Sequence, residues 1–371
     1  MNLFDTYVDE ESKRLVSEVL NSGYLNQGKM VDTLESKLES ELWFKNPLTI
    51  NSCSNSLYLA LLLAGVKEGD EVILPPQTFI ATGLAILWHK AIPVFADVDS
   101  NGNLSPVDFY RKITPKTKAV IPVHWSGIPC EMDLIWEVAQ NKGIKVIEDA
   151  AHALGAWYKS TPIGGCAYSD FCCFSLQAIK TLTAGDGGIL CCRSDEDKER
   201  GVRLRWFGID KKNVQRGPTG DRLMNPQEIG YKFHMNDVAA AIALGNLKTL
   251  KERVNKQREN ASIYLNRLKD YPIVLPIIRD CDPAYWFFQL KISNRDYFVS
   301  QLREKGIPAS TVDRRIDNLD LFKKYKTELS ITNYYDNFQF AVPCHSQLTT
   351  NEVIKVIDTI KEILDEYQPN G

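Results

Sequence analysis

The chain has 371 residues, of which 44% are hydrophobic and 25% are charged, and its formal net charge is −3. This length exceeds what one minimal core needs and favours one large domain with a smaller one beside it. A slightly acidic chain has no general attraction to nucleic acid or to an anionic membrane, so we expect neither as a partner.

The cysteines and histidines do not point to disulfides or to a metal. The nine cysteines are odd in number, and Cys172–Cys173 and Cys191–Cys192 are adjacent pairs. No Cys-x-x-Cys spacing occurs and the five histidines are dispersed, so we expect reduced thiols, a cytoplasmic protein and no metal site. No uninterrupted apolar run approaches the roughly 20 residues that cross a bilayer.

In chain order, the N-terminal segment is expected to form two helices around a turn, over Glu10–Leu20 and Met30–Leu42. Short apolar or β-branched runs then alternate with helical patterns over Ser56–Leu63, Thr82–His89 and Leu134–Asn141. This alternation predicts an α/β fold, with a mostly parallel seven-stranded sheet between helices and ligands at the carboxyl ends of its strands. The predicted strands are Leu48–Asn51, Glu71–Leu74, Ile92–Ala96, Ala119–Val123, Lys145–Ile147, Phe171–Phe174 and Gly188–Cys192.

A smaller α+β domain is predicted at the C-terminus. The pattern changes near Asn236 to a long helical run through Lys269, which we take as the connector. The expected domains are therefore residues 1–247, with the N-terminal segment and the large domain, and residues 248–371. The polar segment Asp210–Pro226 is either a connector or a lid. The predicted elements of the smaller domain are strands over Ile273–Ile278 and Tyr285–Ile292 and helices over Tyr297–Lys305 and Asn351–Glu366.

Asp149 and Lys180 give the clearest chemical signal. Asp149 ends the stretch Lys145–Asp149, and Lys180 follows thirty-one positions later among small residues. A carboxylate that keeps a pyridine nitrogen protonated and a lysine amine that forms a Schiff base are the two groups that pyridoxal 5′-phosphate needs. Either residue alone has an ordinary interpretation, as a helix cap or as an exposed lysine. Together they predict a site for this cofactor.

A phosphate-binding turn is predicted upstream of this pair. Asn51–Ser56 joins a predicted strand to a helix that begins near Leu57, and amides and hydroxyls at a helix N-terminus bind phosphate. An ordinary helix cap is the alternative. Ser175, five residues before Lys180, adds a hydroxyl that could reach the same phosphate.

Six ordered segments resemble the DegT/DnrJ/EryC1/StrS family of sugar aminotransferases, which are pyridoxal-phosphate enzymes of fold type I. The resemblance extends over nearly the whole chain and implies that fold. The segments are Ser22–Gly28, Ser52–Ser54, Pro75–Thr82, Val123–Gly127, Glu148–Ala156 and Phe174–Gly188.

The resemblance implies a role for each matching position at the cofactor. Lys180 would bind the cofactor and then act as general acid and base, Asp149 would hold the pyridinium, and His152 would lie near the O3′ side. The remaining implied contacts are ring stacking by Phe79 and phosphate binding by Cys53, Ser54 and Ser175.

A departure from the family concerns the contact with a neighbouring subunit. Most members have Gly-Tyr-Asn-x-Arg, with the asparagine reaching the neighbour's phosphate, whereas this chain reads Gly230-Tyr231-Lys232-Phe233-His234. We assign Lys232 to the phosphate contact that this asparagine makes, although the side chains of lysine and asparagine differ in geometry. The candidates for substrate binding are Tyr231, His234, Arg314 and Arg315, the last three at the sugar diphosphate.

Lysine at position 180 also indicates amination as the reaction, because the branch of the family that removes a sugar hydroxyl has histidine at this position. The resemblance implies that an amino group moves from L-glutamate to a nucleotide-linked keto-deoxyhexose. A 4-keto-6-deoxy sugar is favoured over a 3-keto sugar, and the enzyme would be a homodimer whose active sites are shared across the interface.

Other functions remain as alternatives. A different fold-type-I reaction, such as decarboxylation or desulfuration, would use the same Lys180 and Asp149. A nucleotide-sugar oxidoreductase is disfavoured because Gly-x-Gly-x-x-Gly between a strand and a helix is absent. For a cofactor-binding regulator we would expect a helix-turn-helix module, and the residues before Arg14 leave no room for one.

Overall fold

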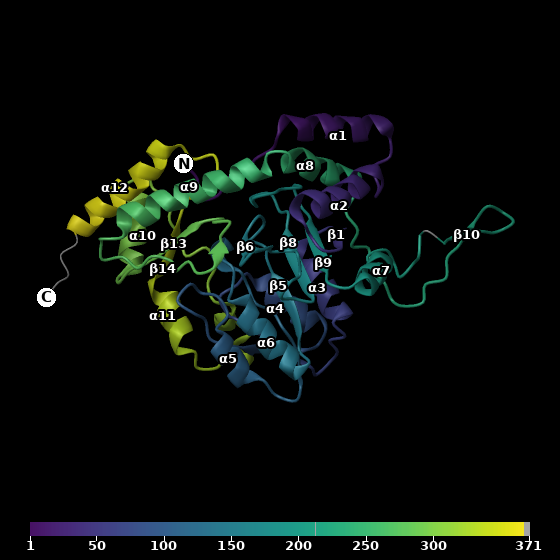
Figure 1. The fold of residues 1–371 in the computed structure, drawn as a ribbon, viewed down its shortest axis with the longest axis horizontal. Helices are drawn as coiled ribbons and strands as arrows, with labels where there is room; N and C mark the ends of the chain where they lie inside the picture. The colour runs from purple at the N-terminus through teal and green to yellow at the C-terminus, as the bar shows by residue number, and fades with distance from the viewer. Residues whose placement is uncertain (212, 367–371) are drawn as a thin grey trace.

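A computed structural model describes residues 1–211 and 213–366, and a seven-stranded sheet forms its centre (Figure 1). The strand order is β1-β9-β8-β5-β4-β2-β3. β9 is antiparallel to both neighbours and the other neighbouring pairs are parallel, so the expected mostly parallel sheet is confirmed. The strands are β1 (Pro47–Ile50), β2 (Glu71–Leu74), β3 (Ile92–Phe95), β4 (Thr117–Val120), β5 (Lys145–Asp149), β8 (Phe171–Ser175) and β9 (Gly188–Cys192).

Both faces of the sheet are buried. Cys172 and Cys173 are consecutive in β8 and belong to two different apolar clusters, because successive side chains of a strand point to opposite faces. Burial on both faces explains why the strands appear in the sequence as continuous apolar runs. The helices between the strands are α3 (Cys53–Leu63), α4 (Ile80–Trp88), α5 (Pro106–Lys112) and α6 (Met132–Lys142), with a 3₁₀ turn η1 (Trp125–Gly127), and α7 (Asp195–Leu204) follows β9.

The N-terminal helices α1 (Glu10–Ser22) and α2 (Lys29–Leu42) pack against α8 (Asp237–Leu247) (Figure 1). Asp237 fixes this packing, because its carboxylate accepts hydrogen bonds from the Gly28 and Val31 amides at 2.8 and 3.1 Å, at the start of α2. A carboxylate at a helix N-terminus satisfies free amides and interacts favourably with the helix dipole. The N-terminal segment is thereby tied to the rest of the fold.

The long helical run expected from 236 to 269 is two helices, α8 and α9 (Leu250–Leu268), separated at Lys248 and Thr249. In Figure 1, α9 reaches from α8 to the C-terminal helix α12 (Thr350–Glu366). The break coincides with our domain boundary at 247/248, but the division itself stays a prediction.

The C-terminal residues form a third apolar cluster around an antiparallel pair, β13 (Phe288–Lys291) and β14 (Gln339–Val342). The expected strand Ile273–Ile278 is wrong: only a single bridge, Val274 to Lys291, forms there. Pro272 and Pro276 explain this, because proline has no amide hydrogen for a strand ladder. The other elements of this part are α10 (Arg295–Glu304), η2 (Ile316–Asn318), η3 (Lys323–Tyr325) and α11 (Ser330–Phe338).

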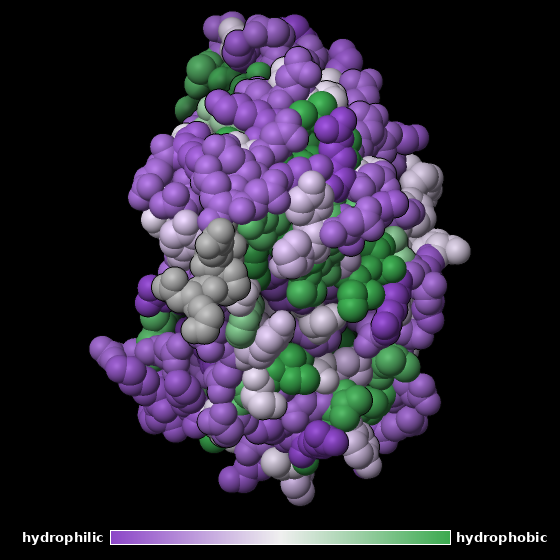
Figure 2. Space-filling view, turned by 90° about the vertical axis from the view of Figure 1, so that its left-hand side faces the viewer, coloured by the Kyte–Doolittle hydropathy of each residue, from purple (hydrophilic) through white to green (hydrophobic). Residues whose placement is uncertain are grey.

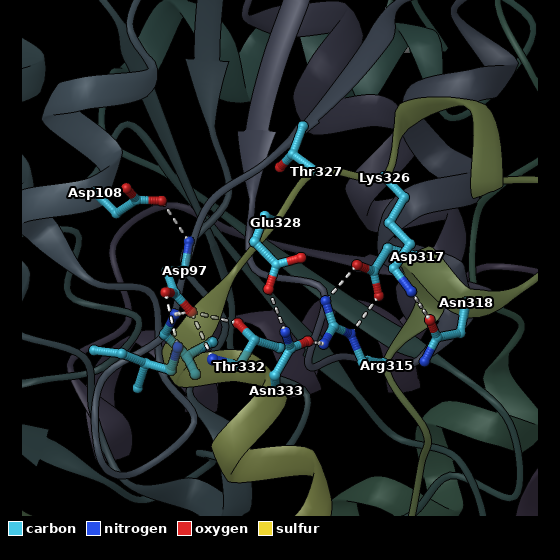
Figure 3. Close-up of polar contacts among 12 residues, drawn as sticks. Asp97, Asp108, Arg315, Asp317, Asn318, Lys326, Thr327, Glu328, Thr332 and Asn333 are labelled. Atoms are coloured by element: carbon cyan, nitrogen blue, oxygen red, sulfur yellow. Dashed lines mark hydrogen bonds and ion pairs between the residues drawn. The ribbon is translucent and has the colours of Figure 1, made fainter.

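Asp97, after β3, caps helix α11 from outside (Figure 3). Its carboxylate accepts hydrogen bonds from the Ile331 amide at 3.0 Å and from the Thr332 amide and hydroxyl at 2.6 and 2.7 Å. The Asp97 amide in turn donates to Asp108 at 2.7 Å. These bonds attach the C-terminal part of the chain to the edge of the large sheet.

The polar segment Asp210–Pro226 contains a short hairpin, β10 (Gln215–Arg216) with β11 (Arg222–Leu223), which projects away from the body in Figure 1. A further small sheet joins β12 (Cys281–Asp282), β6 (Trp157–Tyr158) and β7 (Thr161–Pro162). The face in Figure 2 is mostly hydrophilic with small hydrophobic areas. Within the described residues, no helix combines the length and the apolar composition needed to cross a membrane.

Candidate active site

A cavity of about 450 Å³ lies where β5 and β8 end and α3 begins. The cavity is lined by every residue that we assigned to the cofactor from the sequence, apart from Lys232. These residues are Cys53, Ser54, Phe79, Asp149, His152, Ser175 and Lys180. The carboxyl ends of the parallel strands thus line a candidate ligand site, where the topology predicts one.

Asp149 is the last residue of β5 and is only 5% exposed. Its carboxylate accepts hydrogen bonds from the Thr82 hydroxyl at 2.7 Å and from the Ala151 amide at 3.2 Å. Burial raises the pKa of Asp149, while these two bonds and the charge of Lys180 act in the opposite direction. A buried carboxylate of this kind favours a cationic partner, such as a protonated pyridine.

Lys180 lies in the turn after β8, and its Nζ is 3.4 Å from the centroid of the Trp286 ring. Burial lowers the pKa of Lys180 to about 8, although the nearby carboxylates of Asp149 and Asp313 raise it. The amine therefore loses its proton at a lower pH than an ordinary lysine, and the neutral amine is the state that attacks an aldehyde.

His152 belongs to an aromatic stack beside Lys180. Its ring lies 4.1 Å from Trp286, and Phe4 stacks on Trp286 at 4.2 Å. Burial lowers the pKa of His152, so its imidazole is neutral. His152 is 6% exposed, and its Nδ1 has no hydrogen-bond partner among the described residues. A ligand with a polar atom in the cavity would supply the partner that this nitrogen lacks.

The part of the cavity at the start of α3 has groups that can bind a phosphate. Ser52 caps α3 by accepting a hydrogen bond from the Asn55 amide at 3.2 Å, and Cys53 and Ser54 form the first turn, whose amides have no partner within the helix. A Cβ on Gly188 would lie 2.5 Å from the Ser52 carbonyl carbon, so only glycine permits this close contact between β9 and the turn. Free amides at a helix N-terminus attract anions.

Two further predicted residues complete the fit to pyridoxal phosphate. Ser175 ends β8, is 8% exposed and lines the cavity with its neighbours. Phe79 precedes α4, and its side chain is 57% exposed, so the ring is available for stacking. A buried carboxylate, an amine, an unpaired imidazole nitrogen, an exposed aromatic ring and a phosphate turn thus surround one cavity.

Three predicted residues lie outside this cavity, on the segment that packs beside Asn51. Lys232 is exposed, and the Tyr231 hydroxyl is 2.9 Å from that of Tyr58. His234 Nε2 contacts Asn26 at 2.8 Å. Burial, together with nearby cationic side chains, lowers the pKa of His234 to about 4, so it offers a diphosphate no positive charge near neutral pH.

The expectation for Arg315 has to be corrected. Its side chain is 2% exposed and forms two hydrogen bonds of 2.6 Å with the Asp317 carboxylate (Figure 3). A third bond joins it to Asn333. With its donors engaged in a buried pair, Arg315 is not available to a substrate diphosphate. Arg314 is exposed and stays a candidate.

Three residues that line the cavity were not predicted from the sequence: Phe4, Trp286 and Asp313. They come from the N-terminal segment and from two C-terminal loops, and none belongs to a motif that marks a ligand. The Trp286 indole is fixed by donating to the Ile179 carbonyl at 2.9 Å, next to Lys180. Only the folded chain brings them to the site.

Comparisons with known proteins agree with this geometry. Residues 6–361 match the DegT/DnrJ/EryC1/StrS aminotransferase family. A UDP-4-amino-4-deoxy-L-arabinose–oxoglutarate aminotransferase of Shewanella sediminis is 30% identical, covering 96% of each chain. The crystal structure of the sugar aminotransferase CalS13 from Micromonospora echinospora superposes with a TM-score of 0.92 at 31% identity, covering 97% of this chain and 99% of that one. DesV of S. venezuelae, crystallised with a ketimine intermediate, gives 0.89 at 28%, covering 96% and 95%.

Proposed function

As a member of the DegT/DnrJ/EryC1/StrS aminotransferase family, this chain is a sugar aminotransferase, and we propose that it uses pyridoxal phosphate to transfer the amino group of L-glutamate to a nucleotide-linked 4-keto-6-deoxyhexose. The observation that carries the proposal is the pairing of Lys180 with Asp149 in one cavity. When bound, the cofactor supplies an aldehyde for the amine and a protonated ring that accepts electrons.

Different residues of the cavity would bind different parts of the cofactor. Asp149 would keep the pyridine nitrogen protonated, because its own ionised form gains from the Thr82 and Ala151 hydrogen bonds. Phe79 would cover the ring and His152 would meet a ring oxygen. Ser54, Ser175 and the Cys53 amide would hold the phosphate.

Lys180 would carry out the proton transfers. Its lowered pKa lets the amine both take a proton and return it near neutral pH, which suits a general acid and base. The same group is needed in both directions, since one half of the reaction removes a proton from the donor and the other half adds one to the sugar. Lys180 is therefore the residue on which catalysis depends.

The proposed amino donor and the proposed site of amination on the sugar are both inferred from a related enzyme. The Shewanella enzyme is named for a 4-amino sugar and for oxoglutarate, which is the keto acid of glutamate. Since that enzyme is similar to this chain over nearly its full length, we infer the same donor and amination at C4.

We also propose a homodimer with shared active sites. Among the described residues that line the cavity, Lys180 is the one cationic side chain, whereas glutamate and a sugar diphosphate are both anionic. Lys232 is exposed and lies outside the cavity of its own chain, so it is free to reach the phosphate of a partner. Arg314 and Tyr231 stay candidates for the substrate.

The test is to incubate the purified protein with pyridoxal phosphate, isotopically labelled glutamate and a panel of dTDP-, UDP- and GDP-linked keto sugars, and to follow product mass. We expect labelled nitrogen in a 4-keto-6-deoxy sugar and in none when Lys180→Ala is used. Labelling of a 3-keto sugar alone would correct the position, and labelling of no sugar would contradict the proposed substrate class.

A further inference from the structure

A loop from the C-terminal part of the chain enters the cavity and carries Val312 and Asp313 to its wall. Val312 has a φ of 65°. This left-handed backbone is rare for a β-branched residue, because its side chain collides with the main chain. Such strain persists where the surroundings hold the backbone in place, and it concentrates at functional sites.

Several contacts hold this loop. The Gln77 side chain donates to the Asp313 carbonyl at 3.2 Å, and the Ile316 amide donates to the Pro76 carbonyl at 2.8 Å. Beyond Asp313, the buried Arg315 is clamped by Asp317 and Asn333 (Figure 3). The residue that we had expected at the substrate is therefore an anchor for the loop that bears Asp313.

The carboxylate of Asp313 is free for a role in the cavity. Among the described residues, no side chain or amide donates a hydrogen bond to it, and no contact ion pair joins it to Lys180. Burial raises the pKa of Asp313, and the charge of Lys180 acts against this rise. A half-buried carboxylate without donors is costly, so a cation that approaches it is stabilised.

The other titratable groups around Lys180 are either neutral or already have a partner, so Asp313 is the carboxylate that can attract the protonated lysine. Burial keeps the Cys53 thiol and the His152 imidazole neutral, since it raises the pKa of the first and lowers that of the second. Asp149 would be occupied by the pyridinium, and Asp186 accepts a hydrogen bond from the Gly187 amide at 3.0 Å. The titratable groups that line the cavity with Lys180 are Cys53, Asp149, His152, Asp186 and Asp313. A smaller cavity that Lys180 also lines carries Asp5, Tyr7, Arg253 and His345.

We propose that Asp313 is a positioning residue for Lys180: its carboxylate attracts the lysine nitrogen whenever that nitrogen carries a proton, and so keeps the protonated lysine in the cavity beside Trp286 between the two proton transfers. The 3.4 Å contact of Lys180 Nζ with the Trp286 ring marks the place where it would be held. This inference rests on the proposed use of pyridoxal phosphate.

The test is a pH titration of the visible absorption of the cofactor-loaded protein without any amino donor, comparing the original chain with Asp313→Asn. The absorption reports the proton on the Lys180 nitrogen where it joins the cofactor. Loss of the carboxylate should move the midpoint to lower pH by at least about 0.5 units, since an opposite charge nearby favours the protonated form. Asp320→Asn, on an exposed side chain in the same part of the chain, is the matched control and should leave the midpoint in place.

An unchanged midpoint in Asp313→Asn would overturn the proposal. Failure of the original protein to develop the visible absorption would instead contradict the proposed cofactor, so the two failures are distinguishable. Asp313→Asn removes a half-buried charge and no hydrogen bond, so we expect the variant to fold.

Arg315→Lys tests the anchor. Lysine keeps the charge but loses the fork that binds Asp317 in two places, so the loop should loosen and the midpoint should move in the same direction. In the double variant with Asp313→Asn the shift should equal that of Asp313→Asn alone, because Arg315 acts through Asp313. Additive shifts would overturn the link between the anchor and the carboxylate.

Discussion

At the scale of single residues, the site depends on charges that are unfavourable until a ligand arrives. Asp149 is buried and its pKa is raised, so an ionised carboxylate there costs stability in the cofactor-free protein. His152 Nδ1 likewise has no partner among the described residues. Both costs would be offset by the cofactor, which gives each group an interaction.

Asp149→Asn should therefore change stability and activity in opposite directions. The folded protein holds the Asp149 proton more tightly than the unfolded chain, so this group's contribution to stability falls as the pH rises through its folded pKa. Near neutral pH the cofactor-free variant should be at least as stable as the original in urea unfolding. Turnover should fall by roughly 10²–10³-fold, the usual loss when a charge that stabilises the transition state is removed. A variant that loses stability and keeps its turnover would contradict this role.

Sequence spacing was sufficient to bring Asp149, Lys180 and the Ser52–Ser54 turn together, because each lies at the end of a strand or in the loop after one, and strand ends converge. It was insufficient for Trp286 and Asp313, whose places depend on how a distant part of the chain packs. Arg315 was assigned wrongly for a related reason: an arginine in a loop has the same sequence pattern whether it faces solvent or a buried aspartate.

At the scale of elements, the strands were predicted well and the C-terminal elements less well. Glu71–Leu74 was predicted with the bounds that the structure has, because a strand buried on both faces is a continuous apolar run. The helices α5, α7 and α11 were not predicted; they are 7, 10 and 9 residues long, which gives a weak periodic signal. Helix α11 also lacks a side-chain cap of its own, because Asp97 supplies it from 235 residues away.

Asp97→Ala should destabilise the protein by about 1–2 kcal/mol, since the cap of α11 is lost. The midpoint of urea unfolding measures the change. Asp97→Asn keeps an acceptor oxygen and should recover most of the stability, and Asp320→Ala on the exposed surface should have little effect. Equal losses in the two Asp97 variants would mean that the charge, and not the cap, is what stabilises this contact.

At the scale of the whole molecule, one chain forms the candidate cavity, and Lys180 is the one cationic side chain among the described residues that line it, whereas the proposed substrates are anionic. The hairpin β10–β11 points away from the body, and none of its described residues lines the cavity of its own chain (Figure 1). In this structure the hairpin therefore does not cover that cavity, and the choice between connector and lid stays a prediction. A second copy of the chain is our explanation for how Lys232 reaches a phosphate.

Mixing two inactive variants tests this arrangement. Lys180→Ala and Lys232→Ala should each lose most activity alone. In a hybrid dimer one site carries both substitutions and the other carries neither, so random mixing should restore about a quarter of the original activity, as two-fold symmetry requires. If mixing restores no activity, both lysines act in the active site of one chain. If Lys232→Ala is fully active, Lys232 does not belong to the active site.

The proposed function depends most directly on covalent binding of the cofactor by the Lys180 nitrogen. Borohydride reduction of the cofactor-loaded protein, followed by proteolysis and peptide mapping, measures this directly. We expect a single pyridoxyl label on the peptide that contains Lys180 and no label in Lys180→Ala. A label on another lysine, or a protein that takes up none, would contradict it.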